Sequence, residues 1–79
     1  MTTMPTYRWV LSGENLMMST WNGDAQIVYL IEHDTTLTAE GQWWVRKKVS
    51  GAAEGYTIGC NSSLADAKRL AEADAEQPL

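Results

Sequence analysis

The stretch QWWVRKKVS, residues 42–50, decides the fold, because its side chains alternate between two faces with the period of a β-strand. The two alternating sets are Trp43, Val45, Lys47 and Val49 on one face and Trp44, Arg46, Lys48 and Ser50 on the other. The first set is mostly apolar and the second is aromatic and cationic. The pattern predicts a strand with one face toward a core and the other toward solvent or a partner.

Similar patterns on either side of this stretch predict the rest of a sheet. Residues 7–12, 16–21, 26–33 and 56–60 read as strands, with a turn at residues 12–15 and another at Asn22-Gly23. Residues 26–33 are apolar on both faces, which is typical of a central strand. The sequence as a whole predicts a single domain over residues 1–79, with an ordered core from about residue 6 to residue 75.

The period changes from two to 3.6 near the C-terminus. Leu64, Ala67, Leu70 and Ala71 make an apolar stripe, and Ser63 with Asp66 resembles a capping box, so a helix is expected over residues 64–75. The sequence therefore predicts an α+β fold, an antiparallel sheet of four to five strands with one C-terminal helix packed on one face. One helix covers only one side of such a sheet.

Composition limits the class of protein. The 79 residues carry a net charge of −4, one Cys and four Trp, and the four indoles are expected to fill the core, each removing about 200 Å² from water. A single Cys allows no disulfide within the chain. No basic stretch followed by an apolar run opens the sequence, and residues 27–31, the longest apolar stretch, are too short to span a bilayer. We expect a cytoplasmic protein, without a membrane segment.

Side chains that could catalyse a reaction are sparse. His33 is the only histidine, Cys60 the only cysteine, and neither has a second ligand or base suggested by spacing. A buried, inert role is expected for Cys60, and N-capping explains Ser63. The sequence predicts no enzyme, no metal site and no cofactor.

Two sets of residues suggest a binding surface instead. The acidic set could form one negative face if the chain brings its members together: Glu32, Asp34, Glu40, Asp66, Glu72, Asp74 and Glu76. The alternative set is Trp44, Arg46 and Lys48, an aromatic residue with two cations on a sheet, which suits nucleic acid. A third possibility is that Trp44 is shielded by its cross-strand neighbours while the cations pair with Glu32 or Asp34.

The whole profile resembles the small anti-CRISPR proteins of phages and prophages that disable type I surveillance complexes (Cascade). These share small size, acidity, a compact sheet with a helix and no catalytic set, over the full length and without a common motif. The resemblance implies a role, in the cytoplasm of the host cell, as an inhibitor that occupies the positively charged DNA-binding or PAM-reading surface of Cascade, so that target DNA cannot load. A weaker similarity links the three-strand-and-helix pattern to the N-terminal DNA-binding domains of phage integrases and to plant AP-type factors, which are typically basic.

Three function classes follow from these observations. The leading hypothesis is a non-enzymatic inhibitor that binds a protein partner, such as a type I CRISPR complex, through an acidic, DNA-mimicking surface. The alternatives are a small nucleic-acid-binding domain that uses Trp44, Arg46 and Lys48, and a structural module that pairs with a second copy. Direct nucleic-acid binding is less favoured because the chain is acidic, and either a monomer or a homodimer is compatible with the sequence.

Overall fold

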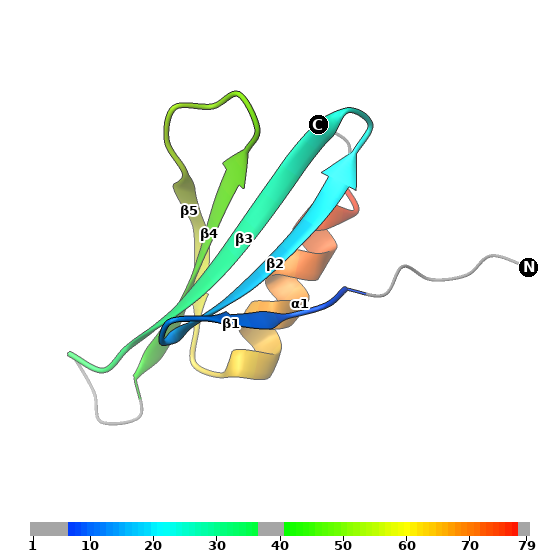
Figure 1. Ribbon diagram of the computed structural model, residues 1–79. Coiled ribbons are helices and arrows are strands. Elements are labelled where there is room, and N and C mark those ends of the chain that lie inside the picture. Colours follow the sequence, from blue (N-terminus) through cyan, green and yellow to red (C-terminus); the bar gives the residue numbers. More distant parts are fainter. Residues whose placement is uncertain (1–6, 37–40, 78–79) are drawn as a thin grey trace, which may run out of the picture.

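The computed structural model describes residues 7–36 and 41–77, and the predicted α+β fold is confirmed. Five strands form one antiparallel sheet in the order β1-β2-β3-β4-β5, followed by one helix, α1 (Figure 1). Their bounds are β1 Val10–Ser12, β2 Asn15–Asn22, β3 Ala25–Asp34, β4 Gln42–Val49, β5 Tyr56–Asn61 and α1 Leu64–Ala75. Each strand pairs with its neighbours in sequence, so the sheet is a simple meander.

Glycines set the two tight hairpins. Gly13 and Gly23 are the first residues of two-residue loops and have φ of +64° and +62°. Two-residue hairpins need this left-handed backbone to match the twist of the strands, and glycine adopts it without steric cost. The turns predicted at residues 12–15 and at Asn22-Gly23 both lie at these hairpins.

The first predicted strand is shorter in the structure than in the sequence analysis. Residues 7–12 read as a strand, but only Val10–Ser12 pairs with β2. Tyr7 and Trp9 instead pack against the core, and the Trp9 indole Nε1 donates a hydrogen bond to Glu72 Oε2 at 3.1 Å. The aromatic alternation in this segment therefore serves to cover part of the helix side of the sheet.

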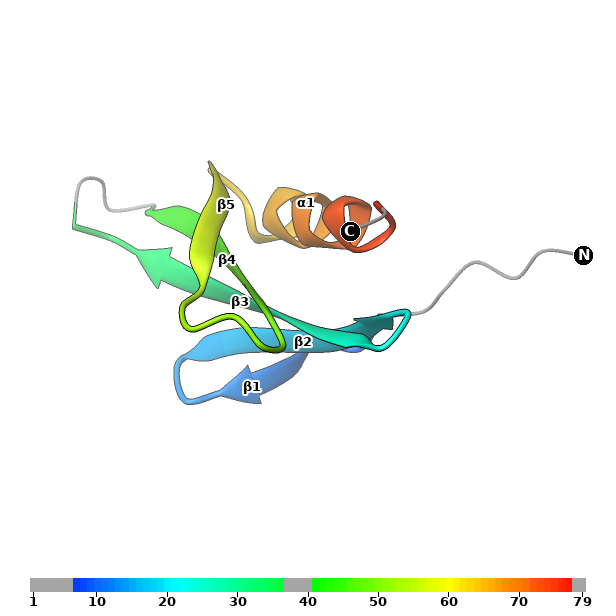
Figure 2. The same ribbon diagram turned by 90° about the horizontal axis from the view of Figure 1, so that it is seen from above.

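Figure 2 shows α1 on one side of the sheet, where it contacts β3, β4 and β5. The helix begins after Ser63, whose hydroxyl accepts a hydrogen bond from the Asp66 amide at 3.2 Å, as the capping pattern predicts. Among the described residues no element lies on the opposite side. The core is the layer between sheet and helix, built from Met18, Ile27, Tyr29, Ile31, Val45, Ala67 and Ala71.

The expectation that the four tryptophans fill this core is wrong. None of them is among the fully buried side chains, and Trp21 is 65% exposed. Trp9 and Trp43 lie at the edge of the core, and Trp44 lies half-buried on the face without a helix. The largest side chain fully buried in the layer is that of Tyr29, and α1 contributes the small side chains of Ala67 and Ala71 to it.

Close packing of α1 depends on Gly59 of β5. A β-carbon at this position would lie 2.4 Å from Leu70 Cδ2, which is far inside van der Waals contact. Leu70 occupies the space that the missing side chain leaves, beside the buried Ala67 and Ala71. A side chain at position 59 would therefore displace the end of the Leu70 side chain from its place between α1 and β5.

We expect Gly59→Ala to lower the free energy of unfolding by about 1–2 kcal/mol, because Leu70 must leave its position to admit the methyl group. Urea denaturation followed by tryptophan fluorescence measures this loss. In a Leu70→Ala background the same replacement should cost less, because the atom that it meets is gone. An equal cost in both backgrounds would contradict the contact.

Candidate functional site

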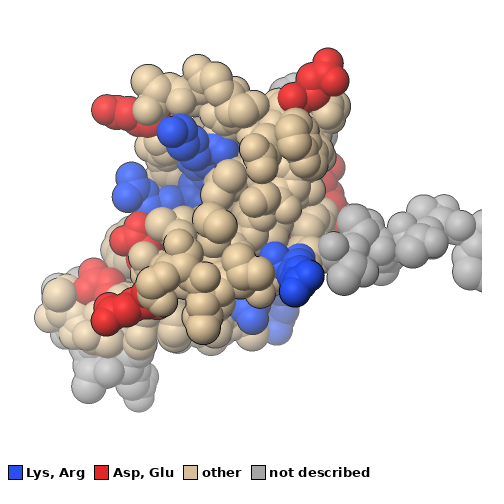
Figure 3. Space-filling model, viewed as in Figure 1, with Lys and Arg blue, Asp and Glu red and all other residues tan. Residues whose placement is uncertain are grey.

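The side chains of the sheet that point away from α1 form what we call the open face, the side seen in Figure 3. Its central members are Met17, Ser19 and Trp21 of β2, Val28, Leu30 and Glu32 of β3, and Trp44, Arg46 and Lys48 of β4. Trp44, Arg46 and Lys48 thus share one surface, as the alternation in residues 42–50 predicts. The middle of this surface is largely uncharged in Figure 3.

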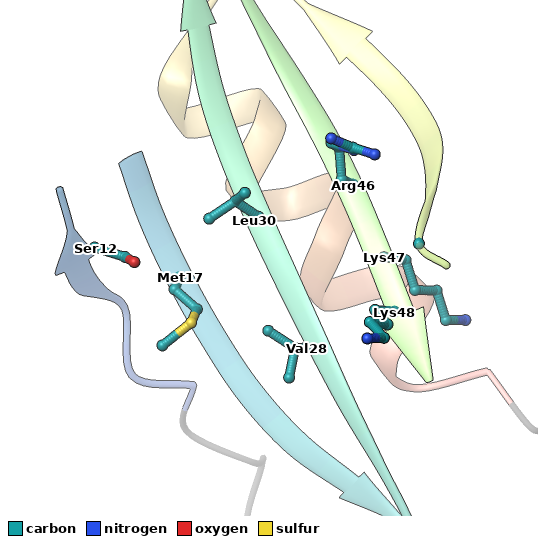
Figure 4. A pocket seen from close by; sticks show the side chains of 8 residues that line it. Ser12, Met17, Val28, Leu30, Arg46, Lys47 and Lys48 are labelled. Atoms are coloured by element: carbon teal, nitrogen blue, oxygen red, sulfur yellow. The ribbon is translucent and has the colours of Figure 1, made fainter. Parts of the chain in front are cut away.

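An open hollow of about 410 Å³ lies in the middle of the open face (Figure 4). Met17, Val28 and Leu30, all half-buried, make its apolar floor. The strand register explains the shape, because Met17, Leu30 and Arg46 lie side by side in one row across the sheet, and Val28 and Lys48 lie side by side in the next. Other lining residues are Ser12, Lys47 and Gly55.

Cations and then carboxylates follow one another along β3 and β4 on the open face. Lys48 and Arg46 border the hollow, whereas Glu32 and Asp34 follow further along β3 toward its C-terminal end. Arg46 Nη1 lies 3.5 Å from Glu32 Oε1, with the two side chains 50% and 39% exposed. An exposed pair at this distance contributes less than about 1 kcal/mol, so the guanidinium can exchange this partner for another.

Trp44 lies in the acidic end of this face. It is the cross-strand neighbour of Glu32, and Asp34 follows Glu32 on the same face of β3. Hydrogen bonds from the Thr36 hydroxyl and backbone amide hold the pKa of Asp34 below its usual range. Two carboxylates beside the ring repel the phosphates of any strand whose bases stack on it.

The acidic set divides between the two sides of the sheet. Glu32 and Asp34 belong to the open face, whereas the four carboxylates of the helix region belong to the other side. Several form contacts within the protein: Asp66 pairs with Arg69 at 2.8 Å, and Glu72 accepts the Trp9 hydrogen bond. Glu76 is exposed at the helix C-cap, and Glu40 lies outside the described residues.

The carboxylate of Asp74 joins the helix to the centre of the sheet. Its Oδ2 accepts a hydrogen bond from the Tyr29 hydroxyl at 2.6 Å and forms a 2.7 Å ion pair with Lys47 Nζ. Tyr29 is fully buried, and the Lys47 side chain is 9% exposed. We call these three residues the buried network.

Protonation equilibria follow from this arrangement. Burial and the hydrogen bond to Asp74 raise the pKa of Tyr29 well above its usual value. Burial alone lowers the pKa of Lys47, but the hydrogen bond and charge of Asp74 outweigh it and raise the pKa. Burial alone raises the pKa of Asp74, but the hydrogen bonds from Lys47 and Tyr29 reverse the direction and lower it. The network therefore favours a charged Lys47–Asp74 pair with a neutral Tyr29.

The side chains first considered for chemistry have structural contacts. Cys60 is half-buried on β5, and its sulfur lies 3.0 Å from Gln42 Oε1. The His33 ring stacks on Trp43, with ring centres 3.8 Å apart and planes 5° from parallel. In the described ranges no three His, Cys, Asp or Glu side chains are grouped as metal ligands. No helix in that part of the chain combines the length and the apolar character needed to cross a membrane.

The hollow and the buried network were both missed by sequence reasoning. Val28 and Leu30 face away from the helix, and their apolar character was interpreted only as a sign of a central strand. Without helix coverage on that side, the same residues signal an exposed apolar floor. Lys47 lies on the otherwise apolar face of residues 42–50, and a buried lysine requires a carboxylate partner from another element. This requirement could have predicted the contact with Asp74.

Comparison with known proteins adds no further constraint. A scan against family models finds no match, and searches of curated proteins and of solved structures find no significant match.

We expect Asp74→Asn to lower the free energy of unfolding at pH 7 by about 2–3 kcal/mol, because the variant leaves the Lys47 ammonium buried beside a neutral amide. The pKa of Asp74 is lower in the folded state than in the unfolded state. Its stabilisation is therefore present above about pH 4 and is lost as pH falls through the folded pKa. The variant lacks this component of acid sensitivity.

Urea denaturation at pH 7 and at steps between about pH 5 and pH 2 measures both effects. Glu76→Gln is the matched control, because it removes an exposed carboxylate two residues further along and should change stability by less than about 0.5 kcal/mol. Equal losses in the two variants would contradict the importance of the buried network.

Proposed function

We propose that this protein acts without turnover, by binding another protein through the open face of its sheet. The observation that carries the proposal is the apolar hollow of Met17, Val28 and Leu30 on a side of the sheet that α1 leaves uncovered. A contiguous exposed apolar surface with a polar border is typical of interaction sites. Trp21, 65% exposed on the same face, adds an aromatic side chain of the kind that anchors interfaces.

A protein partner fits the charge pattern of this face better than nucleic acid does. A nucleic-acid strand carries negative charge along its whole length, so a strand that crosses the face from Lys48 to Trp44 meets Glu32 and Asp34. A protein surface can present carboxylates to one end and cations or neutral groups to the other. The separation of charges along the face therefore favours a protein partner over the nucleic-acid alternative.

One observation also supports the narrower role suggested by the resemblance, inhibition of a type I Cascade. Glu72 and Glu76 lie near the C-terminal end of α1, outside the buried network, and they act on a neighbouring group: burial first, and then the charges of Glu76 and Glu72, raise the pKa of Tyr7. Such a cluster could contact a basic DNA-binding surface. The cluster is smaller than the seven-residue face inferred from the sequence, because Glu32 and Asp34 lie across the sheet.

For the leading proposal, we expect Leu30→Asp to abolish retention of a partner protein by affinity-tagged material in an extract of the host cell. Ala73→Asp, which adds the same charge at an exposed site on the helix, should retain the partner. Quantitative mass spectrometry of the bound proteins measures the difference, and circular dichroism checks that both variants are folded. If neither variant loses retention of the partner, or if both lose it equally, the contact lies elsewhere.

For the Cascade role, we expect the paired reversal Glu72→Lys with Glu76→Lys to weaken complex formation and to restore target-DNA loading. The matched control is Asp24→Lys with Glu54→Lys, which changes net charge equally at exposed loop sites. Asp74 is left unchanged because its reversal would break the buried network. A pull-down with purified Cascade and a DNA-binding competition assay measure the effect, and undiminished DNA loading with the unmodified protein would reject this role.

A further inference from the structure

We infer that the hollow on the open face takes a protein segment in which an apolar anchor side chain is flanked on one side by carboxylates. This inference rests on the proposed function and names the chemistry of its partner. It depends on three features of the hollow: its apolar floor, the cations at one border, and the carboxylates beyond the opposite border.

The floor defines the anchor. Met17, Val28 and Leu30 come from two adjacent strands and expose apolar atoms to a volume of about 410 Å³, within the range of roughly 300–1,000 Å³ that is typical of binding pockets. Figure 4 shows these three side chains on the side of the sheet opposite the helix. Water in this hollow has few polar partners on the floor, so its displacement by an apolar side chain is favourable.

The border defines the charge of the flanking residues. Lys48 is exposed, and none of the described carboxylates forms an ion pair with it. Arg46 has only its loose, exposed contact with Glu32. Lys47, the third cation near the hollow, already pairs with Asp74 in the buried network. Two cations therefore remain to receive carboxylates from a partner, and both lie on β4.

The carboxylates of the open face itself limit which positions of the partner segment can be negatively charged. Glu32 follows Leu30 by two residues on the same face of β3, and Asp34 follows Glu32 by two more. A segment with carboxylates on both sides of its anchor would place one set against these residues. The complementary partner has its carboxylates on the Lys48 side only, which distinguishes it from a uniformly charged nucleic acid.

Titration with synthetic peptides tests this inference. The probe is an N-acetylated peptide in which two leucines precede three glutamates. Its binding is monitored by NMR of the methyl groups of Met17, Val28 and Leu30. Two comparison peptides have glutamine in place of glutamate, or serine in place of leucine. We expect shifts at these three residues with the probe, and binding at least about fivefold weaker with either comparison peptide.

Variants of the protein locate the charge contact. We expect Lys48→Glu to weaken binding of the probe by about fivefold to tenfold, and the unmodified protein to lose affinity as salt concentration rises. Lys68→Glu, the same change on α1, should alter binding by less than about twofold. Equal effects of the two variants, or equal binding of the glutamine peptide, would overturn the inference.

Further outcomes assign the face to a different occupant and also overturn the inference. Tighter binding of a twelve-nucleotide single-stranded DNA at the same methyl groups would indicate nucleic acid. A dimer mass in light scattering that Leu30→Asp abolishes would indicate a second copy of this chain. If no peptide binds while Leu30→Asp still abolishes partner capture, the proposed function stands and only the partner chemistry is wrong.

Discussion

One helix of twelve residues cannot cover both sides of a five-stranded sheet, and most features of this molecule follow from that constraint. The helix side becomes the core, where Gly59, Ala67 and Ala71 let α1 approach closely. The other side keeps its apolar residues in contact with solvent. A protein of 79 residues has little buried surface to spare, so an uncovered apolar floor is a cost to stability that binding would offset.

Charge placement separates the residues that hold the fold from those available to a partner. Asp74 and Lys47 neutralise each other between helix and sheet, with Tyr29 donating to the same carboxylate. These groups are therefore not available to an acidic surface, although their residue types suggested one. On the open face, Arg46 has only an exposed 3.5 Å pair with Glu32, and none of the described carboxylates forms an ion pair with Lys48. The net charge of −4 thus does not describe this face, whose centre is largely uncharged and whose borders carry both acidic and basic groups (Figure 3).

Local patterns predicted most of the elements, because each reflects a periodicity that neighbouring residues impose. The alternation in residues 42–50 and the stripe of Leu64 and Leu70 both gave elements that the structure contains. The first strand was predicted too long because Tyr7 and Trp9 follow the alternation of a strand. In the structure their rings pack against the core, and only Val10–Ser12 pairs with β2. The tryptophans were assigned to the core on size alone. Which aromatic ring is fully buried between sheet and helix depends on packing between distant parts of the chain, and in the structure that ring is Tyr29.

Local patterns were enough to predict the strands, the two tight hairpins, the C-terminal helix and the shared face of Arg46 and Lys48, because period, turn residues and capping act within a few residues. Tertiary structure decided that Met17, Val28 and Leu30 form one hollow, that Asp74 reaches Lys47, and that the acidic residues divide between two sides. Each of these depends on strand register and on which face the helix covers. No local pattern specifies either, since both result from packing among segments that are far apart in the chain.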